Sequence, residues 1–279
     1  MVKSILLAID GSAYTEYVLQ YGVHLAKTFQ AHLKVLTVVD VRFFEWAIAI
    51  GVEGFAPVLP SATYQEESQK ILEEKADRVL ERASEMLKET GVMFSVEKES
   101  GSPVEVICEK VKVADLLVMG ARGEFEKWSD KMLGATFESV SRLSIKPIFV
   151  VHKKFEPLTS LLLAYDGSEN SNRALPWAGF WAERLNVPVT VLTVHDDPEN
   201  ARTIVEEAED YLKAYSIPAL TTLTKSGDAA ETIVTTAQEL NVQAVIMGSY
   251  GHSRIREAIL GSTTVQVMRK SPVPVLMVK

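Results

Sequence analysis

Hydrophobic residues along the chain follow two patterns in turn: short continuous apolar runs, and longer segments in which every third or fourth residue is apolar. Between short apolar runs, apolar residues recur every three or four positions over 18–26 and 72–86, and this spacing predicts amphipathic helices. The same helical spacing returns over 174–185 and 204–215. In the first part of the chain the apolar runs predict strands over residues 3–10, 33–39, 94–99, 115–120 and 147–151. Such strands, separated by helices, indicate parallel sheets that are covered on both faces.

One long segment of this pattern occurs twice. Ile-Leu-Leu-Ala-Ile-Asp-Gly-Ser at 5–12 returns as Leu-Leu-Leu-Ala-Tyr-Asp-Gly-Ser at 161–168. The repeat is far longer than the roughly 20–50 residues of stacked repeat arrays. We therefore predict two tandem α/β domains, each a doubly wound, Rossmann-like parallel sheet, over residues 1–153 and 158–279, with a short joint between them.

Charge and composition narrow the class of protein. The net charge of −8 over 279 residues argues against general binding to nucleic acid or to an anionic membrane, because both need clustered Lys and Arg. The single Cys108 permits no intrachain disulfide, as expected in a reducing compartment. No apolar run approaches the ~20 residues of a membrane-spanning helix. We expect a soluble cytoplasmic protein.

The second copy carries two features suited to a phosphate group. Gly248 and Gly251 follow the apolar run 244–247, at the strand end where open α/β sheets bind ligands. Without a Cβ, their backbone N–H groups can approach an anion closely. Gly261 then precedes a predicted helix whose N-terminus offers unpaired N–H groups, and Ser262 and Thr263 add hydroxyls.

The order Gly-x2-Gly-x9-Gly-Ser, the Asp-Gly-Ser turn at 166–168 and the apolar tail at 274–278 together resemble the universal stress protein family. The resemblance implies binding of ATP or a related adenine nucleotide (AMP or ADP), with Mg²⁺ as a further candidate. It places Asp166 near the nucleoside or its metal, the backbone around Val194 at the adenine edge, and Gly248 at the ribose. It assigns the phosphates to Gly251, Gly261, Ser262 and Thr263. His252 lies in the same loop, where basic side chains suit a polyanion.

The resemblance also implies how the copies associate. Single-domain members pair through their last strands, so residues 147–151 and 274–278 are expected to lie against each other across a pseudo-two-fold axis. A homodimer of the whole chain stays open. The family's role implies a stress-response regulator or protectant.

The first copy departs from the glycine pattern. Ten residues separate Gly123 from Gly134, and Ala135 replaces the expected Ser or Thr. Acidic residues within this spacing oppose bound phosphate. Thr136 could supply the missing hydroxyl, so a second site that includes Asp10, Gly120, Gly123, Gly134 and Thr136 is not settled by the sequence.

Other interpretations stay open. The glycines could form only a strand-to-helix connection, with Ser262 capping its helix and Asp10 or Asp166 capping another. The aromatic insert at 41–60 could bind a partner protein, cover a ligand or pack at the joint between the domains. An ATPase or phosphotransferase is the remaining alternative. The chain lacks the Gly-x4-Gly-Lys-Ser/Thr loop, and no general base is identifiable, so no catalytic residue is assigned.

Overall fold

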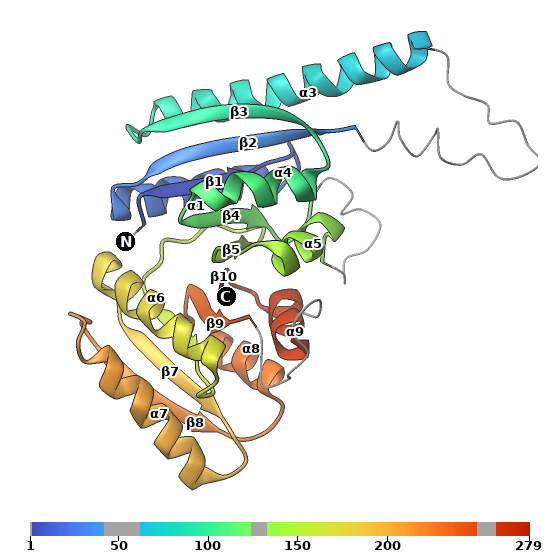
Figure 1. The fold of residues 1–279 in the computed structure, drawn as a ribbon. Helices are drawn as coiled ribbons and strands as arrows, with labels where there is room; N and C mark the ends of the chain where they lie inside the picture. The colour runs from blue at the N-terminus through green and yellow to red at the C-terminus, as the bar shows by residue number, and fades with distance from the viewer. Residues whose placement is uncertain (1, 42–61, 124–132, 250–260) are drawn as a thin grey trace, which may run out of the picture.

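The computed structural model describes residues 2–41, 62–123, 133–249 and 261–279. Within these residues the chain forms one ten-stranded sheet in the order β3-β2-β1-β4-β5-β10-β9-β6-β7-β8 (Figure 1). Every neighbouring pair is parallel except β5 and β10, which are antiparallel at the centre of the sheet. Each half therefore contributes five strands with the same internal order.

The first half contains β1–β5 and the helices that connect them. All five predicted strands are confirmed within about two residues at each end. The elements are β1 (Ser4–Ala8), α1 (Thr15–Phe29), β2 (His32–Asp40), α3 (Ala62–Lys88), β3 (Phe94–Gly101), α4 (Pro103–Lys110), the 3₁₀ helix η1 (Val111–Val113), β4 (Leu116–Gly120), α5 (Ala135–Leu143) and β5 (Ile148–Val151). The N-terminal part of α3 extends beyond the end of β3 (Figure 1).

The second half repeats this series. Its elements are β6 (Leu161–Ala164), α6 (Glu169–Leu185), β7 (Val189–Val194), α7 (Pro198–Leu212), β8 (Leu220–Lys225), α8 (Ala229–Glu239), β9 (Ala244–Gly248), α9 (Ser262–Lys270) and β10 (Val275–Val278). Gln30 and Asn186, which end the matching helices α1 and α6, both adopt the left-handed conformation. The sequence repeat is thus a repeat of structure as well.

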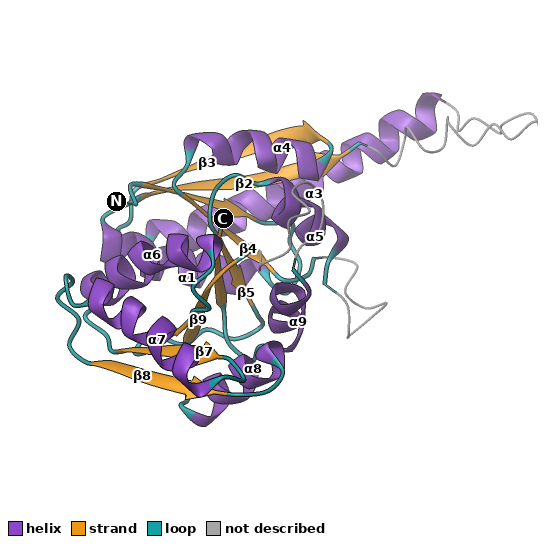
Figure 2. Cartoon of the chain, turned by 60° about the horizontal axis from the view of Figure 1, so that its bottom comes forward, coloured by secondary structure: helices purple, strands orange, loops and turns teal. Residues whose placement is uncertain are grey.

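Two hydrophobic clusters run along the sheet, one on each face. The helices α1, α3, α6 and α7 cover one face, and α4, α5, α8 and α9 cover the other (Figure 2). Each cluster includes residues from both halves. Apolar runs buried on both faces explain why the strands are nearly continuous in hydrophobic residues. None of the helices built from the described residues is long and apolar enough to cross a bilayer.

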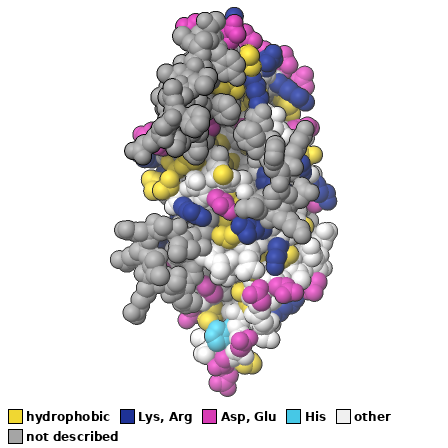
Figure 3. Space-filling view, turned by 90° about the vertical axis from the view of Figure 1, so that its right-hand side faces the viewer, with side chains coloured by type: hydrophobic (Ala, Val, Ile, Leu, Met, Phe, Trp, Pro, Cys, Tyr) yellow, Lys and Arg dark blue, Asp and Glu magenta, His cyan; other side chains and the backbone are white. Residues whose placement is uncertain are grey.

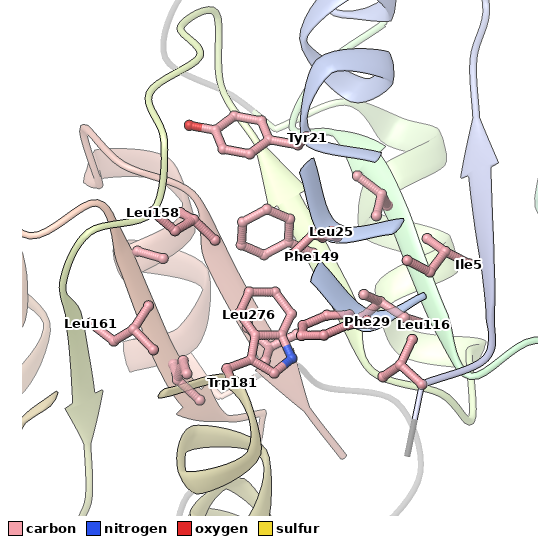
Figure 4. Packing of buried hydrophobic residues seen from close by; sticks show 14 of the residues in the cluster. Ile5, Tyr21, Leu25, Phe29, Leu116, Phe149, Leu158, Leu161, Trp181 and Leu276 are labelled. Atoms are coloured by element: carbon pink, nitrogen blue, oxygen red, sulfur yellow. The ribbon is translucent and has the colours of Figure 1, made fainter. Parts of the chain in front are cut away.

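The two halves meet at an aromatic core beside the central strand pair. The Trp181 ring of α6 lies 5.1 Å from that of Phe149 on β5 and 5.6 Å from that of Phe29 on α1, measured between ring centroids (Figure 4). Leu276 on β10 is paired with Phe149 and is fully buried beside them. The expected contact between the last strands of the two halves is therefore present, as an antiparallel pair.

Candidate functional site

The candidate site of the second half lies where β6, β7 and β9 end. Ala164 pairs with Leu192 and with Met247, so the three strands are aligned and their following residues share one edge of the sheet. This register brings Asp166, Val194 and Gly248 to the same edge, as the sequence predicts. Gly251 and His252 lie outside the described residues.

Asp166 organises the turn that follows β6. Its Oδ1 accepts a hydrogen bond from the Ser168 backbone N–H at 3.0 Å, and Gly167 between them has a φ of +74°. Ser168, rather than Asp166, is the N-cap of α6 and accepts from the Ser171 N–H at 3.2 Å. The alternative that Asp166 caps the helix is therefore wrong; its side chain is exposed and belongs to the turn that follows β6.

Gly248 has a packing role that the sequence did not reveal. A Cβ built on it would lie 2.5 Å from the carbonyl carbon of Asn170 and 2.7 Å from the Ser171 nitrogen. The end of β9 thus touches the backbone at the start of α6, and only glycine fits there. This contact fixes the end of β9 against the start of α6, the helix that follows the Asp166 turn.

The N-cap of α9 is a glycine, so the N-cap residue itself has no side chain that could accept from the first N–H groups of the helix. Gly261 is the N-cap, and no side-chain capping hydrogen bond is present. Ser262, the first helical residue, is exposed and Thr263 is half-buried. The alternative that Ser262 caps α9 is wrong, and these N–H groups keep the partial positive charge of a helix N-terminus.

Thr264, which the sequence analysis overlooked, anchors α9. Its buried hydroxyl donates to the carbonyl oxygen of Ser249 at 3.0 Å, and the Ser249 N–H donates to the Val278 carbonyl at 2.8 Å. A polar residue among the apolar positions of a helix was the available signal. The bond holds the start of α9 against the end of β9, on the same edge as the Asp166 turn.

Two acidic residues of the neighbouring loops accept hydrogen bonds from backbone N–H groups. Asp197 accepts from the N–H groups of Glu199 and Asn200 at the start of α7, and Asp228 accepts from Glu231 at the start of α8. Among the described residues, no three carboxylate, imidazole or thiol groups form a cluster that could hold a metal ion.

In the first half, residues of the possible second nucleotide site also lie close together. The Asp10 Oδ1 accepts from the Ser12 N–H at 2.9 Å, matching the turn at Asp166. A Cβ on Gly123 would lie 2.5 Å from the Asp10 carboxylate, and one on Gly134 would lie 3.2 Å from Arg122. The Gly134 N–H is already bonded to the Ala121 carbonyl at 3.0 Å. Gly134 is the N-cap of α5, and Thr136 is half-buried in its first turn. Of the described glycines, Gly123 lies directly against the Asp10 turn.

Cys108 lies on α4, away from the residues of these two candidate sites. Cys108 is half-buried on α4, and burial raises the pKa of its thiol, which keeps it protonated and unreactive near neutral pH. The insert at 41–60, apart from Val41, falls outside the described residues.

The fold and its two strand-edge sites define a class of protein: a covalent pair of doubly wound α/β domains joined through their last strands. A model of the universal stress protein family matches residues 1–152 and 158–279. The chain belongs to the universal stress protein family.

The chain is similar to several individual universal stress proteins. Universal stress protein Slr1230 of Synechocystis is 30% identical, over 99% of this chain and 99% of its own length. The crystal structure of a universal stress protein from Archaeoglobus fulgidus matches 99% of this chain and 98% of that one with a TM-score of 0.79 at 25% identity. A shorter universal stress protein, solved in complex with cAMP, matches 43% of this chain and 95% of its own at 28% identity and a TM-score of 0.39.

Proposed function

We propose that the chain binds ATP or a related adenine nucleotide, mainly in its second half, and acts as a stress-response regulator or protectant. The observation that supports this most directly is the N-terminus of α9, where no described side chain caps the first N–H groups and where Thr264 holds the helix at the edge that also carries the Asp166 turn. A helix N-terminus without a side-chain cap leaves N–H donors available for phosphate oxygens.

The proposed contacts are those that the family resemblance implies for this edge of the sheet. The triphosphate lies along the loop after β9 and the start of α9, and it contacts Gly251, His252, Gly261, Ser262 and Thr263. The Asp166 carboxylate binds the ribose hydroxyls or a Mg²⁺ ion that accompanies the phosphates. Adenine lies against the backbone at Val194, where β7 ends, and Gly248 keeps the ribose close to the strand edge.

The test is the amount of nucleotide bound per chain. The purified protein is equilibrated with ATP, freed of unbound nucleotide and denatured, and the released adenine nucleotide is quantified. We expect about one nucleotide per chain, and a loss of at least tenfold in affinity for Gly261→Asp, whose carboxylate repels phosphate at the helix start.

Gly134→Asp is the matched control, because Gly134 is the N-cap of α5 as Gly261 is of α9. It should leave the second-half site intact, with both variants checked for folding by circular dichroism. Retained binding in Gly261→Asp together with lost binding in Gly134→Asp would move the site to the first half. No bound nucleotide in the wild-type protein would refute the proposal.

A further inference from the structure

The strand β8 (Leu220–Lys225) is the last strand of the sheet on the side of the second half. It pairs in parallel with β7 along one side, and among the described residues it pairs with no other strand. Figure 2 shows β8 at the outer margin of the molecule. In the described part of the chain, the second side of β8 therefore faces away from the sheet.

The backbone hydrogen bonds show which groups of β8 point outward. The carbonyl oxygens of Ala219 and Lys225 each accept a hydrogen bond at 2.9 Å from the neighbouring β7 side. Successive residues of a strand direct their N–H and C=O groups to opposite sides, so every second residue faces β7 and the residues between face away. Each residue that faces away offers one donor and one acceptor to a further strand. These outward residues are Leu220, Thr222 and Thr224.

The opposite edge strand of the sheet, β3, is protected by charge. Glu97, Lys98 and Glu99 follow one another on it. Lys98 forms an ion pair with Asp77 of α3 at 2.6 Å, and Lys110 of α4 pairs with both glutamates. Charged side chains on an edge strand oppose its pairing with a strand of another chain. The edge at β3 is therefore a poor site for association.

The edge at β8 lacks this protection. Residues 220–224 are Leu-Thr-Thr-Leu-Thr, with no charge and no proline, and Lys225 at the end of the strand pairs with Glu239 of α8 at 2.7 Å. Thr221 and Thr224 are exposed, and the other residues of β8 are half-buried. Threonine is favourable in strands because its branched side chain packs well on a pleated surface. The composition of β8 thus suits pairing with a further strand.

The strand β8 is complementary to a second copy of itself. In an antiparallel pair, residues that exchange hydrogen bonds must both direct their N–H and C=O groups toward the partner. A two-fold axis at Thr222 meets this condition, because Thr222 then lies opposite its own counterpart and Leu220 lies opposite Thr224. No like charges face each other in this register, and facing threonines form a favourable cross-strand pair. Pairing about a two-fold axis also closes, whereas pairing of β8 with β3 of another copy would continue without end.

We propose that two copies of the chain associate through β8, antiparallel about a two-fold axis at Thr222, so that their two sheets become one continuous sheet. The outward N–H and C=O groups of Leu220, Thr222 and Thr224 in each copy exchange hydrogen bonds with those of the other. This interface uses neither the joint between β5 and β10 nor the glycine loop after β9. It therefore does not rest on the proposed binding of a nucleotide.

The helix α7 makes this association depend on salt. It packs on β7 and β8, and acidic side chains gather at the lower end of the molecule in Figure 3, the end at which α7 and β8 lie in Figure 1. Pairing through β8 brings the two α7 helices toward each other, and their like charges oppose it until salt screens them. Within α7, the carboxylates outnumber the guanidinium group of Arg202; they are Glu199, Glu206, Glu207, Glu209 and Asp210.

Sedimentation of the full chain, in salt of about 0.5 M so that charges on α7 are screened, tests the proposal. We expect a monomer–dimer equilibrium for the wild-type protein and a loss of at least tenfold in dimer affinity for Thr222→Pro. Proline there removes an outward N–H group and no hydrogen bond to β7. Val96→Pro is the matched control and should change the affinity less than twofold. Val96 faces outward on β3, because the Met93 carbonyl, three residues before it, accepts from the Leu33 N–H of the β2 side at 3.0 Å.

Cross-linking gives a second measurement that a loss of stability cannot imitate. Hydrogen-bonded residues of an antiparallel pair have Cα atoms about 5.5 Å apart, within the roughly 4.4–6.8 Å that a disulfide spans. Mild oxidation should therefore join two copies of Thr222→Cys, and it should not join two copies of Val96→Cys or of the wild-type chain. Gly261→Asp should dimerise normally, so this proposal and the nucleotide proposal can fail separately.

Three results would overturn the proposal: a wild-type chain that stays monomeric at every concentration, equal losses of dimer affinity in Thr222→Pro and Val96→Pro, or cross-linking through position 96 in place of position 222.

Discussion

Single residues at the candidate site serve the fold and the proposed ligand together. Gly248 illustrates this, because the absence of a side chain lets β9 end against the backbone of Asn170 and Ser171. The sequence predicts that Gly248 lets the backbone approach a ligand closely. The structure shows that a glycine is needed there in any case, because the backbone of α6 lies against it. The sequence motif does not distinguish these two demands.

Gly248→Ala should lower the free energy of unfolding by about 1–3 kcal/mol, because a Cβ at 2.5 Å from a backbone atom forces the start of α6 to move. Urea unfolding followed by circular dichroism measures this. Ser249→Ala is the neighbouring control. The Ser249 hydroxyl is buried and has no hydrogen-bond partner among the described residues, so its removal should be neutral or stabilising. Equal destabilisation by both variants would contradict the packing role of Gly248.

At the scale of elements, the helices α1 and α6 hold the halves together on one face of the sheet. They meet through aromatic rings, with Phe29 of α1 5.0 Å from Phe180 and 5.6 Å from Trp181 of α6. On the opposite face α5 and α9 lie side by side and meet through the contact between Glu138 and Arg269 (Figure 2). The apolar contact supplies the larger share of the stability, since an exposed ion pair contributes little.

Replacing Trp181, which is fully buried, tests this ranking. Trp181→Ala should cost about 3–5 kcal/mol of unfolding free energy, because it leaves a cavity between α6, Phe29 and Phe149. Trp181→Phe should cost less than half as much, since the indole N–H has no hydrogen-bond partner in the described part of the chain. Chemical denaturation of both variants gives the comparison, and similar losses for the two would show that cavity volume does not dominate.

The whole molecule behaves as one cooperative unit if its core is shared. β5 and β10 lie at the centre of the sheet, and each hydrophobic cluster contains residues of both halves. Neither half can expose its side of this joint without uncovering Phe149 or Leu276, which are fully buried. The halves should therefore unfold together.

We expect tryptophan fluorescence and circular dichroism to report a single, coincident urea transition for the wild-type chain. Leu276→Asp should lower its midpoint strongly and separate the two signals, because it buries a charge at the joint. Val96→Asp is the control, since Val96 on the edge strand β3 is 43% exposed. Separate transitions in the wild-type protein would show that the halves are independent.

Much of this architecture could be predicted because the spacing of apolar residues along the chain indicates which side chains are buried. The alternation of apolar runs and helical periods located the strands of the first half, and the repeat of Asp-Gly-Ser and the glycine loop located the second. The turn at Asp166 and the glycine at the start of α9 followed from the same motifs. The alternative in which Asp166 or Ser262 only caps a helix is wrong, because Ser168 and Gly261 occupy the N-cap positions.

By itself, the sequence determined the α/β class, the two similar halves and the residues at each strand end, because these depend on neighbours a few positions apart. Only the tertiary structure decided that Gly248 touches Asn170, that Thr264 anchors α9 and that Arg269 contacts Glu138. Those contacts join residues that are distant in the chain. The last of them depends on the antiparallel joint of β5 and β10, which places α9 of one half beside α5 of the other.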